Sequence, residues 1–274
     1  MQKLDRSPLN LAELRARLTV PAGALSAVDV VDQTGSTNAD LVAAAASGAA
    51  DRTVLIAEQQ VSGKGRQQRS WESPARAGLY LSVLLRPAQV PPSRYGWLSL
   101  LAGVALADTV SGVAGVSAGL KWPNDLLVDG RKCAGILAEA ASGAVVIGIG
   151  LNVSHSAEEL PEAPGGLPAT SLQLCDAKTT DRTELAIALL ERFTELEHGW
   201  RRHVGDPESS GLLAAYRARC ATLGQSVRAL LPDGKSIEGV ASDIDKDGRL
   251  VILTGDGVPA PVSAGDIVHL RPAT

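Results

Sequence analysis

Three apolar segments that follow one another closely constrain the fold of this chain more than any other feature. They cover residues 119–128, 132–141 and 144–153, and the pairs Asp129-Gly130 and Ser142-Gly143 separate them. Segments of this length and composition predict β-strands, and these pairs are typical of tight turns. Strands joined by such short turns are antiparallel. We therefore expect an antiparallel sheet in the middle of the chain.

Helices and further strands are expected on both sides of these segments. Leu79, Leu81, Val83 and Leu85 alternate along the chain, which predicts a strand over residues 78–86 with these side chains on one face. The other expected strands cover residues 28–31 and 53–60. The expected helices cover residues 9–18, 36–48, 97–111, 181–200 and 212–220. The segment 61–76 is polar, basic and glycine-containing, so we expect a mobile loop there.

Short strand-like runs dominate the chain after Gly224. They cover residues 226–231, 236–244, 249–253, 260–262 and 267–270. Turn sequences such as Asp247-Gly248 separate them, a pattern that predicts a small β-barrel. We therefore expect two domains, at 1–223 and 224–274.

Composition excludes several classes of protein. The chain has 274 residues, 45% of them apolar and 20% charged, with a net charge of −4, as in soluble globular proteins. It contains no apolar stretch close to the ~20 residues that cross a bilayer, and its start lacks the apolar region of a signal peptide. Three cysteines without a CxxC pair and four scattered histidines argue against a disulfide framework and a zinc site. The acidic net charge argues against binding to DNA, and we expect a cytoplasmic protein without a membrane partner.

Three familiar motifs are incomplete. Asp243-x-Asp245-x-Asp247-Gly248 begins like a calcium loop, but its twelfth position is Thr254, so we expect a β-turn. Gly148-Ile-Gly150 lacks the third glycine of a dinucleotide fingerprint. Gly63-Lys64-Gly65 lacks the earlier glycine and the hydroxyl residue of a P-loop. The sequence supports neither type of nucleotide site.

A basic loop and a polar strand segment carry stronger signals. The loop GKGRQQRSW, residues 63–71, places Lys64, Arg66 and Arg69 beside glycines that let backbone N–H groups approach an anion. A solvated basic loop is the alternative. The segment KWPND, residues 121–125, puts a cation, an amide and a carboxylate into an otherwise apolar strand. Its structural alternative is a bulged strand end with a packed tryptophan.

Two glycine-containing strands complete the pattern. Lys132 starts one strand, and Gly135 follows at a position where the missing side chain permits close approach of a ligand. Gly148 and Gly150 alternate on one face of the next strand, ahead of Asn152. These glycines would leave a bare floor on which a flat ring could lie. Cys133 is expected to be a small buried residue rather than a nucleophile.

Together with Ser36-Thr37-Asn38, these motifs resemble those of the biotin protein ligases, in the same order along the chain. The resemblance covers residues 28–224 and the small C-terminal barrel. It implies an α+β fold in which a mixed β-sheet is flanked by helices, as in class II aminoacyl-tRNA synthetases, followed by an SH3-like barrel. It also implies a two-step reaction: biotin and MgATP give biotinyl-5′-AMP, and a lysine of a biotin carboxyl carrier protein of an acyl-CoA carboxylase then takes the biotinyl group.

The resemblance also assigns roles to residues. Lys132 and Arg66 are the expected catalytic residues, and Asp125 is the expected contact for Mg2+ together with substrate phosphates. The expected biotin-binding residues are Ser36, Thr37, Asn38, Gln60, Gly63, Lys64, Arg66, Lys132, Gly135, Gly148 and Gly150. The expected contacts to ATP and its phosphates are Arg66, Arg69, Trp71, Lys121, Asn124, Lys132 and Asn152.

Two departures from the family pattern and two alternative functions accompany this assignment. Lys64 and Gln68 stand where the family loop usually has arginine and glycine, which puts the rate of loop closure in doubt but not the chemistry. A lipoate-type acyl ligase shares the fold but lacks the KWPND signature. A biotin-responsive repressor would need a three-helix DNA-binding head, and the residues before Ser36 predict one helix. We therefore expect a ligase that does not bind DNA, as a monomer or weak homodimer.

Overall fold

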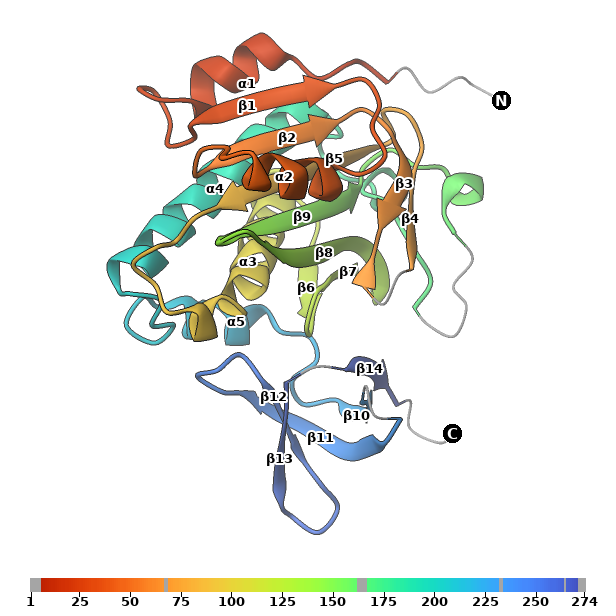
Figure 1. Ribbon diagram of the computed structural model, residues 1–274. Helices are drawn as coiled ribbons and strands as arrows, with labels where there is room; N and C mark the ends of the chain where they lie inside the picture. The colour runs from red at the N-terminus through yellow and green to blue at the C-terminus, as the bar shows by residue number, and fades with distance from the viewer. Residues whose placement is uncertain (1–5, 67–68, 162–166, 232–233, 264, 271–274) are drawn as a thin grey trace.

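The central element of the computed structural model is a mixed β-sheet with helices on both faces (Figure 1). The structure describes residues 6–66, 69–161, 167–231, 234–263 and 265–270. Within them, seven strands run in the order β1-β2-β5-β9-β8-β7-β6, and β1 and β2 are parallel while the other neighbours are antiparallel. Their bounds are β1 Ala27–Val31, β2 Thr53–Ala57, β5 Gly78–Leu85, β6 Ala118–Lys121, β7 Asp125–Val128, β8 Arg131–Ala141 and β9 Ala144–Asn152. The expected fold class is confirmed.

Helices complete the layers on either side of the sheet. Asp181 caps the longest described helix, α4, by accepting hydrogen bonds from the backbone N–H groups of Thr183 and Glu184. No described helix is long and apolar enough to cross a membrane. The helices are α1 Leu11–Leu18, α2 Thr37–Ala46, α3 Trp97–Gly112, α4 Arg182–Arg202 and α5 Leu212–Arg219, and the short 3-10 turns are Pro92–Arg94, Ala157–Glu159 and Gln173–Cys175.

The two faces of the sheet differ. Leu79, Leu81, Val83 and Leu85 of β5 lie in the large core with α3 and α4, as their alternation predicts. On the other face, Leu84 belongs to a small cluster under α2, which crosses in front of β5 and β9 in Figure 1. Beyond this cluster, Gly135 and Leu137 of β8 and Gly148 and Gly150 of β9 line a cavity on the same face. This half of the sheet is therefore available to a ligand.

Two segments differ from their expected structure. Residues 119–128 form a hairpin of β6 and β7, not one strand, because Pro123 has no N–H to donate to a ladder, and Leu120 then pairs with Leu126. The expected mobile loop contains a second hairpin, β3 Gln60–Lys64 paired with β4 Ser70–Ser73. A hydrogen bond from the Gly65 N–H to the Arg69 carbonyl, 2.7 Å long, closes it. Gln68, one of the two departures from the family pattern, lies outside the described residues.

The C-terminal strands form a separate antiparallel sheet below the first (Figure 1). Its order is β13-β12-β11-β10-β14, with bounds β10 Ser226–Leu230, β11 Ser236–Ile244, β12 Leu250–Leu253, β13 Pro259–Val262 and β14 Asp266–His269. The calcium-like segment is a turn, as expected, with Asp245 paired to Arg249 at 2.7 Å.

The domain boundary at residue 223 stays a prediction; it falls between α5 and β10.

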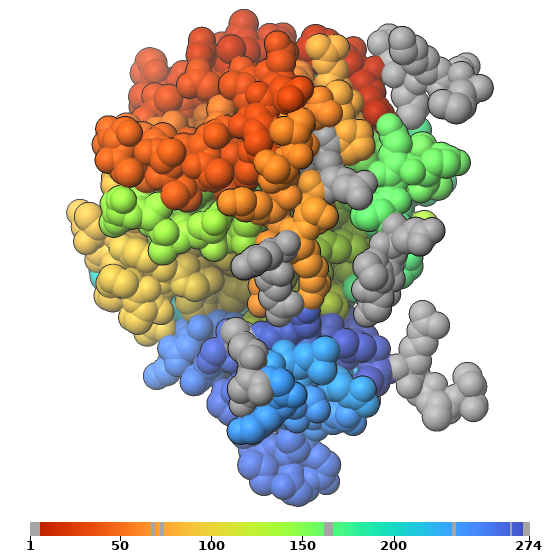
Figure 2. Space-filling view, turned by 45° about the vertical axis from the view of Figure 1, so that its right-hand side comes forward, coloured from red at the N-terminus to blue at the C-terminus, as the bar shows by residue number. Residues whose placement is uncertain are grey.

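Two buried indoles join the sheets. Trp97 Nε1 donates to the Lys246 carbonyl and Trp122 Nε1 donates to the Gly248 carbonyl, each at 2.9 Å. Both tryptophans are 1% exposed, so each indole N–H satisfies its hydrogen bond only through this turn of the C-terminal sheet. In Figure 2 the β3–β4 hairpin, in orange, reaches down over the green strands to the blue C-terminal sheet. The hairpin thus spans the junction of the two sheets.

Candidate active site

A cavity of about 1120 Å3 lies where the α2 N-terminus, both hairpins, β8, β9 and β14 meet. All but one of the residues expected at the site line this cavity. The expected residues that line it are Ser36, Thr37, Asn38, Gln60, Lys64, Arg66, Arg69, Trp71, Lys121, Asn124, Asp125, Lys132, Gly135, Gly148, Gly150 and Asn152. The structure therefore brings segments from six parts of the chain into one concave surface.

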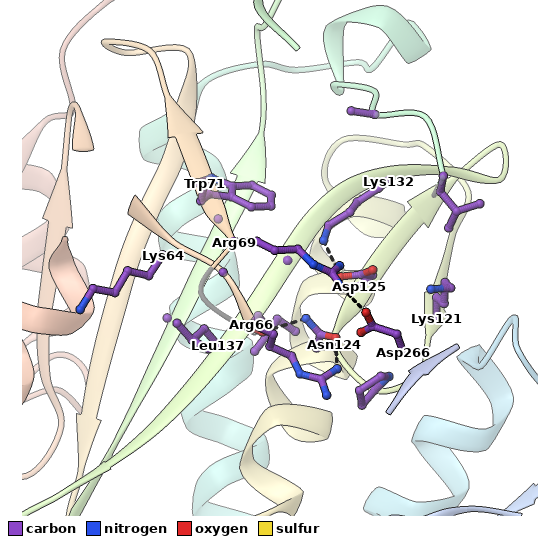
Figure 3. A pocket seen from close by; sticks show the side chains of 18 of the residues that line it. Lys64, Arg66, Arg69, Trp71, Lys121, Asn124, Asp125, Lys132, Leu137 and Asp266 are labelled. Atoms are coloured by element: carbon purple, nitrogen blue, oxygen red, sulfur yellow. Dashed lines mark hydrogen bonds and ion pairs between the residues drawn. The ribbon is translucent and has the colours of Figure 1, made fainter. Parts of the chain in front are cut away.

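Gly63 is the exception. It is buried within the β3–β4 hairpin, where it pairs with Trp71, and it does not line the cavity. Lys64 lines the cavity, but its side chain is exposed and points away from the other cations in Figure 3. The residues assigned to the site by motif therefore do not all present their side chains to the same space.

One end of the cavity is neutral and rich in hydroxyl and amide groups. Ser36 is the N-cap residue of α2, yet its side chain makes no capping hydrogen bond. The capping is done instead by Gln60, whose Oε1 accepts from the Thr37 backbone N–H at 2.9 Å. The Thr37 hydroxyl lies 2.7 Å from the buried Ser82 hydroxyl. The start of α2 thus leaves the Ser36 side chain available to a ligand.

The glycines of β8 and β9 make room for side chains of the protein itself. A Cβ at Gly148 would lie 2.3 Å from Asn38 Oδ1, and a Cβ at Gly150 would lie 2.6 Å from the Trp71 ring. A Cβ at Gly135 would meet the same ring at 3.0 Å. The expected bare floor therefore exists, but in this structure the flat ring on it is the indole of Trp71.

The other end of the cavity is strongly cationic. Lys132 Nζ lies 2.7 Å from Asp125 Oδ1 and 5.5 Å from the centre of the Trp71 ring (Figure 3). Lys121 lies opposite Asp125 in the strand register of the β6–β7 hairpin. Burial lowers the pKa of Lys121 below its ordinary value, and the nearby Lys132 charge lowers it further, while Asp125 opposes the shift. Asp125 thus forms an ion pair with Lys132 and offsets part of the pKa shift of Lys121.

Two arginines of the hairpin complete this end. Arg66 Nη1 donates to Asn124 Oδ1 at 2.9 Å, so the basic hairpin is tied to the KWPND turn. Arg69 forms an ion pair with Asp266 of β14 (Figure 3). Four cationic side chains therefore meet two carboxylates, an arrangement that suits a polyanion able to displace one of them.

Asn152 and Cys133 lie on neighbouring strands behind the cations. Asn152 is 5% exposed and its Nδ2 donates to the Thr170 carbonyl at 2.9 Å, which leaves the Oδ1 side of the amide for a ligand. Cys133 is fully buried, and burial raises the pKa of its thiol. It is therefore a packed neutral residue, as expected, and not a nucleophile.

Comparisons with known proteins give the same picture. Residues 30–154 match the model of the Biotin/lipoate A/B protein ligase family, and residues 222–270 match the Biotin protein ligase C terminal domain. The chain is 47% identical to the biotin--[acetyl-CoA-carboxylase] ligase of Mycobacterium tuberculosis over 97% of both chains. The chain belongs to the biotin protein ligase family.

Other biotin protein ligases agree in sequence and fold. The bifunctional ligase/repressor BirA of Escherichia coli is 32% identical over 94% of this chain and 77% of its own length. The biotin protein ligase of Aquifex aeolicus in complex with biotin and ATP superimposes with a TM-score of 0.75, at 25% identity, over 90% of this chain and all of that one. The fold around the cavity is thus that of the family.

The family resemblance implies Mg2+ with the ATP, and the donor set here fits it only in part. Asp125 is already paired with Lys132, and Asn124 Oδ1 accepts from Arg66. Among the described residues there is no group of three or more His, Cys, Asp or Glu side chains that could hold a metal ion. Such a site fits Mg2+ that arrives on ATP, because phosphate oxygens can complete its coordination.

Sequence reasoning missed the residues contributed by β14 and one buried hydroxyl. Asp266 and His269 line the cavity from the C-terminal sheet, and no local pattern shows how closely that sheet approaches. Burial lowers the pKa of His269, and the Lys121 charge lowers it further. Ser82 lies beneath Thr37, and its sequence signal is a single serine in the apolar and aromatic strand GLYLSVLL.

Proposed function

We propose that this protein joins biotin to a lysine of a biotin carboxyl carrier domain, in two steps that consume MgATP. One observation carries the proposal: a single cavity has a neutral hydrogen-bonding end at Thr37 and Gln60 and a cationic end at Lys132 and Arg69. Biotin has a neutral ureido ring at one end and a carboxylate at the other. The name of the M. tuberculosis protein includes biotin and acetyl-CoA carboxylase, and the A. aeolicus protein is in complex with biotin and ATP, which supports the same substrates.

In the first step, a biotin carboxylate oxygen attacks the α-phosphorus of ATP and pyrophosphate leaves. Both reactants are anions, so cations must hold them together. Lys132 is placed for this, because Asp125 fixes its ammonium group at the cationic end of the cavity. Arg66 and Arg69 approach from the hairpin and can bind the phosphates. Mg2+ bound to ATP would neutralise the charge of the departing pyrophosphate.

In the second step, the lysine amine of the carrier attacks the carbonyl carbon of biotinyl-5′-AMP. The amine loses a proton, the new amide bond forms and AMP leaves. Until then the mixed anhydride must be kept from water. The β3–β4 hairpin lies across the cavity and is tied to Asn124 and Asp266, so it can shield the intermediate from solvent.

A transfer assay tests the proposal. Purified protein, MgATP, labelled biotin and a biotin carboxyl carrier domain should give a labelled carrier, and labelled lipoate should not. Lys132→Ala should lower the rate of adenylate formation by at least a hundredfold with the fold intact. Arg131→Ala is the matched control, because Arg131 is the next residue on β8 but does not line the cavity. A loss below tenfold in Lys132→Ala would contradict the role of Lys132, and transfer of lipoate instead of biotin would contradict the function.

A further inference from the structure

A chain of hydrogen bonds beneath the neutral end of the cavity begins at Glu139 of β8. Asn38 Nδ2 donates to Glu139 Oε2 at 2.7 Å and lies 3.3 Å from the Leu137 carbonyl. Both partners are acceptors, so they require the NH2 group of Asn38 on this side. Asn38 Oδ1 must therefore face the opposite way, toward β5.

The next two links follow from counting hydrogens. Ser82 donates its one hydroxyl hydrogen to Asn38 Oδ1 at 2.6 Å. The Ser82 and Thr37 hydroxyls lie 2.7 Å apart, a distance that requires a hydrogen between the two oxygens. Because the Ser82 hydrogen is already used, Thr37 supplies it. The Thr37 hydroxyl hydrogen thus points down into the protein and not toward Gln60 Oε1, which is 3.1 Å away.

Burial shields the inner links of this chain from water, which could otherwise reverse them, whereas Glu139 at its outer end is partly exposed. Thr37 is 3% exposed, Asn38 4% and Ser82 0%. The close approach of Asn38 to β9 depends on Gly148, where any Cβ would meet the amide oxygen. The missing side chain of Gly148 thus makes room for the Asn38 amide, in addition to the role of Gly148 as an expected biotin contact.

We propose that Glu139, through Asn38 and Ser82, fixes the Thr37 hydroxyl as a hydrogen-bond acceptor, so that this end of the cavity selects ligands with a ring N–H. Glu139 and Ser82 are positioning residues that need not touch the ligand. The proposal rests on the proposed function, because a ureido ring presents two such N–H groups. A ring with oxygen in place of the N–H would bring a second acceptor against the Thr37 lone pairs.

Isothermal titration of the full-length protein with biotin and two cyclic carbamate analogues tests this. In each analogue, oxygen replaces one of the ring N–H groups. Wild type should bind the carbamate altered at the Thr37 side at least thirtyfold more weakly than biotin, since a site built for a donor rejects its isostere. Ser82→Ala frees the Thr37 hydrogen to turn toward the ligand. Glu139→Gln lets the Asn38 amide turn over and reverse the chain. Both variants should reduce the discrimination at least fivefold.

Controls separate this effect from a structural one. Thr109→Val removes a buried hydroxyl of α3 that donates to the Ala105 carbonyl, outside the cavity, and should keep the wild-type ratio. In Ser82→Ala and Glu139→Gln the KM for biotin should rise, while the adenylation rate at saturating biotin stays within about twofold. A variant that is merely destabilised would weaken biotin and carbamate equally.

A ratio within twofold of wild type in either variant overturns the proposal, even if the protein ligates biotin normally. Wild-type protein that binds neither biotin nor the carbamates overturns the proposed function instead. Reduced discrimination in both variants with an unchanged ratio in Thr109→Val supports the chain of hydrogen bonds from Glu139 to Thr37.

Discussion

Asp125 gives Lys132 a partner before any substrate is present, and this has two effects. The ion pair fixes the direction of a flexible side chain, so less conformational entropy is lost when the anions bind. It also means that the phosphates compete with a carboxylate for the same ammonium group. Removal of Lys132 would leave the Asp125 charge without its partner in a site proposed to bind anions, which is why we expect a large loss of activity in Lys132→Ala.

Outside the site, His155 should control the response of stability to acid. It is 1% exposed, its Nε2 lies 3.2 Å from the Tyr80 hydroxyl, and burial lowers its pKa to about 4, helped by Arg6 and opposed by Glu159. The neutral ring is favoured in the folded state, so its stabilisation is complete above the unfolded pKa of ~6.5 and is lost as the pH falls toward the folded value. The free energy of unfolding should drop by about 2 kcal/mol between pH 6.5 and 4.5.

The measurement is denaturant unfolding across that pH range, with His155→Gln and His198→Gln compared. His155→Gln should flatten the profile, whereas His198, which is exposed, should change nothing. The range stops at pH 4.5 because Glu159, whose pKa is lowered to about 2 chiefly by Arg6, adds its own loss of stability below that value. Equal slopes in wild type and His155→Gln would contradict the prediction.

At this scale, the residues that the sequence identified share a feature: each is chemically out of place in its local pattern. Lys121 and Asp125 interrupt apolar strands, and Gly148 removes a side chain from a packed one. Asp266 does not break its local pattern, because carboxylates are common beside turns. Its partner Arg69 lies almost two hundred positions away, and only the folded chain shows the contact.

At the scale of elements, the β3–β4 hairpin is the main departure from expectation. Like charges on a glycine-containing segment argue for a disordered loop, but two contacts oppose this. Trp71 packs on the glycines of β8 and β9, and Arg66 bonds to Asn124. The sequence showed the charges and the tryptophan, but not the bare surface that receives the ring. The strand pairing itself was therefore beyond local prediction.

Removal of the indole should loosen the hairpin. Trp71→Ala should speed tryptic cleavage after Lys64, Arg66 and Arg69 at least fivefold without ligand, because the ring that packs against Gly150 is lost. Biotin with MgATP should slow cleavage of the wild type. Cleavage after Arg131 in the same digests is the internal control and should not change. Wild-type cleavage that is already as fast as that of Trp71→Ala would show that the hairpin is not anchored through the indole.

At the scale of the molecule, the ion pair between Arg69 and Asp266 couples the two sheets to the substrate. In the proposed function Arg69 binds the triphosphate, so Asp266 would hold that arginine while its own charge repels the ligand. Asp266→Asn should therefore lower the KM for ATP by about threefold at low salt and by less at high salt, because both groups are partly exposed. Asp247→Asn, in the same sheet but outside the large cavity, is the matched control. A KM that rises in Asp266→Asn would mean that the contact assembles the site rather than competing with ATP.

The arrangement of the two sheets explains what could not be foreseen. Strand positions, turn residues and the barrel-like C-terminal pattern follow from hydrophobic periodicity and turn chemistry. The contact between the sheets depends instead on Trp97 and Trp122, whose indoles donate to the turn that ends at Gly248. Hydrogen bonds between residues so far apart in the chain produce no periodic pattern in the sequence. The C-terminal residues of the site were missed for that reason.

The position of Trp71 makes the protein its own optical reporter. The chain has four tryptophans, and Trp97, Trp122 and Trp200 are at most 1% exposed and do not line the large cavity. Trp71 alone lines the cavity, on the surface that a substrate ring would share and beside the Lys132 charge. A change in intrinsic emission on adding biotin or ATP should therefore arise from this one indole. Trp71→Phe should abolish the change while the emission of the three core indoles remains as a constant internal standard.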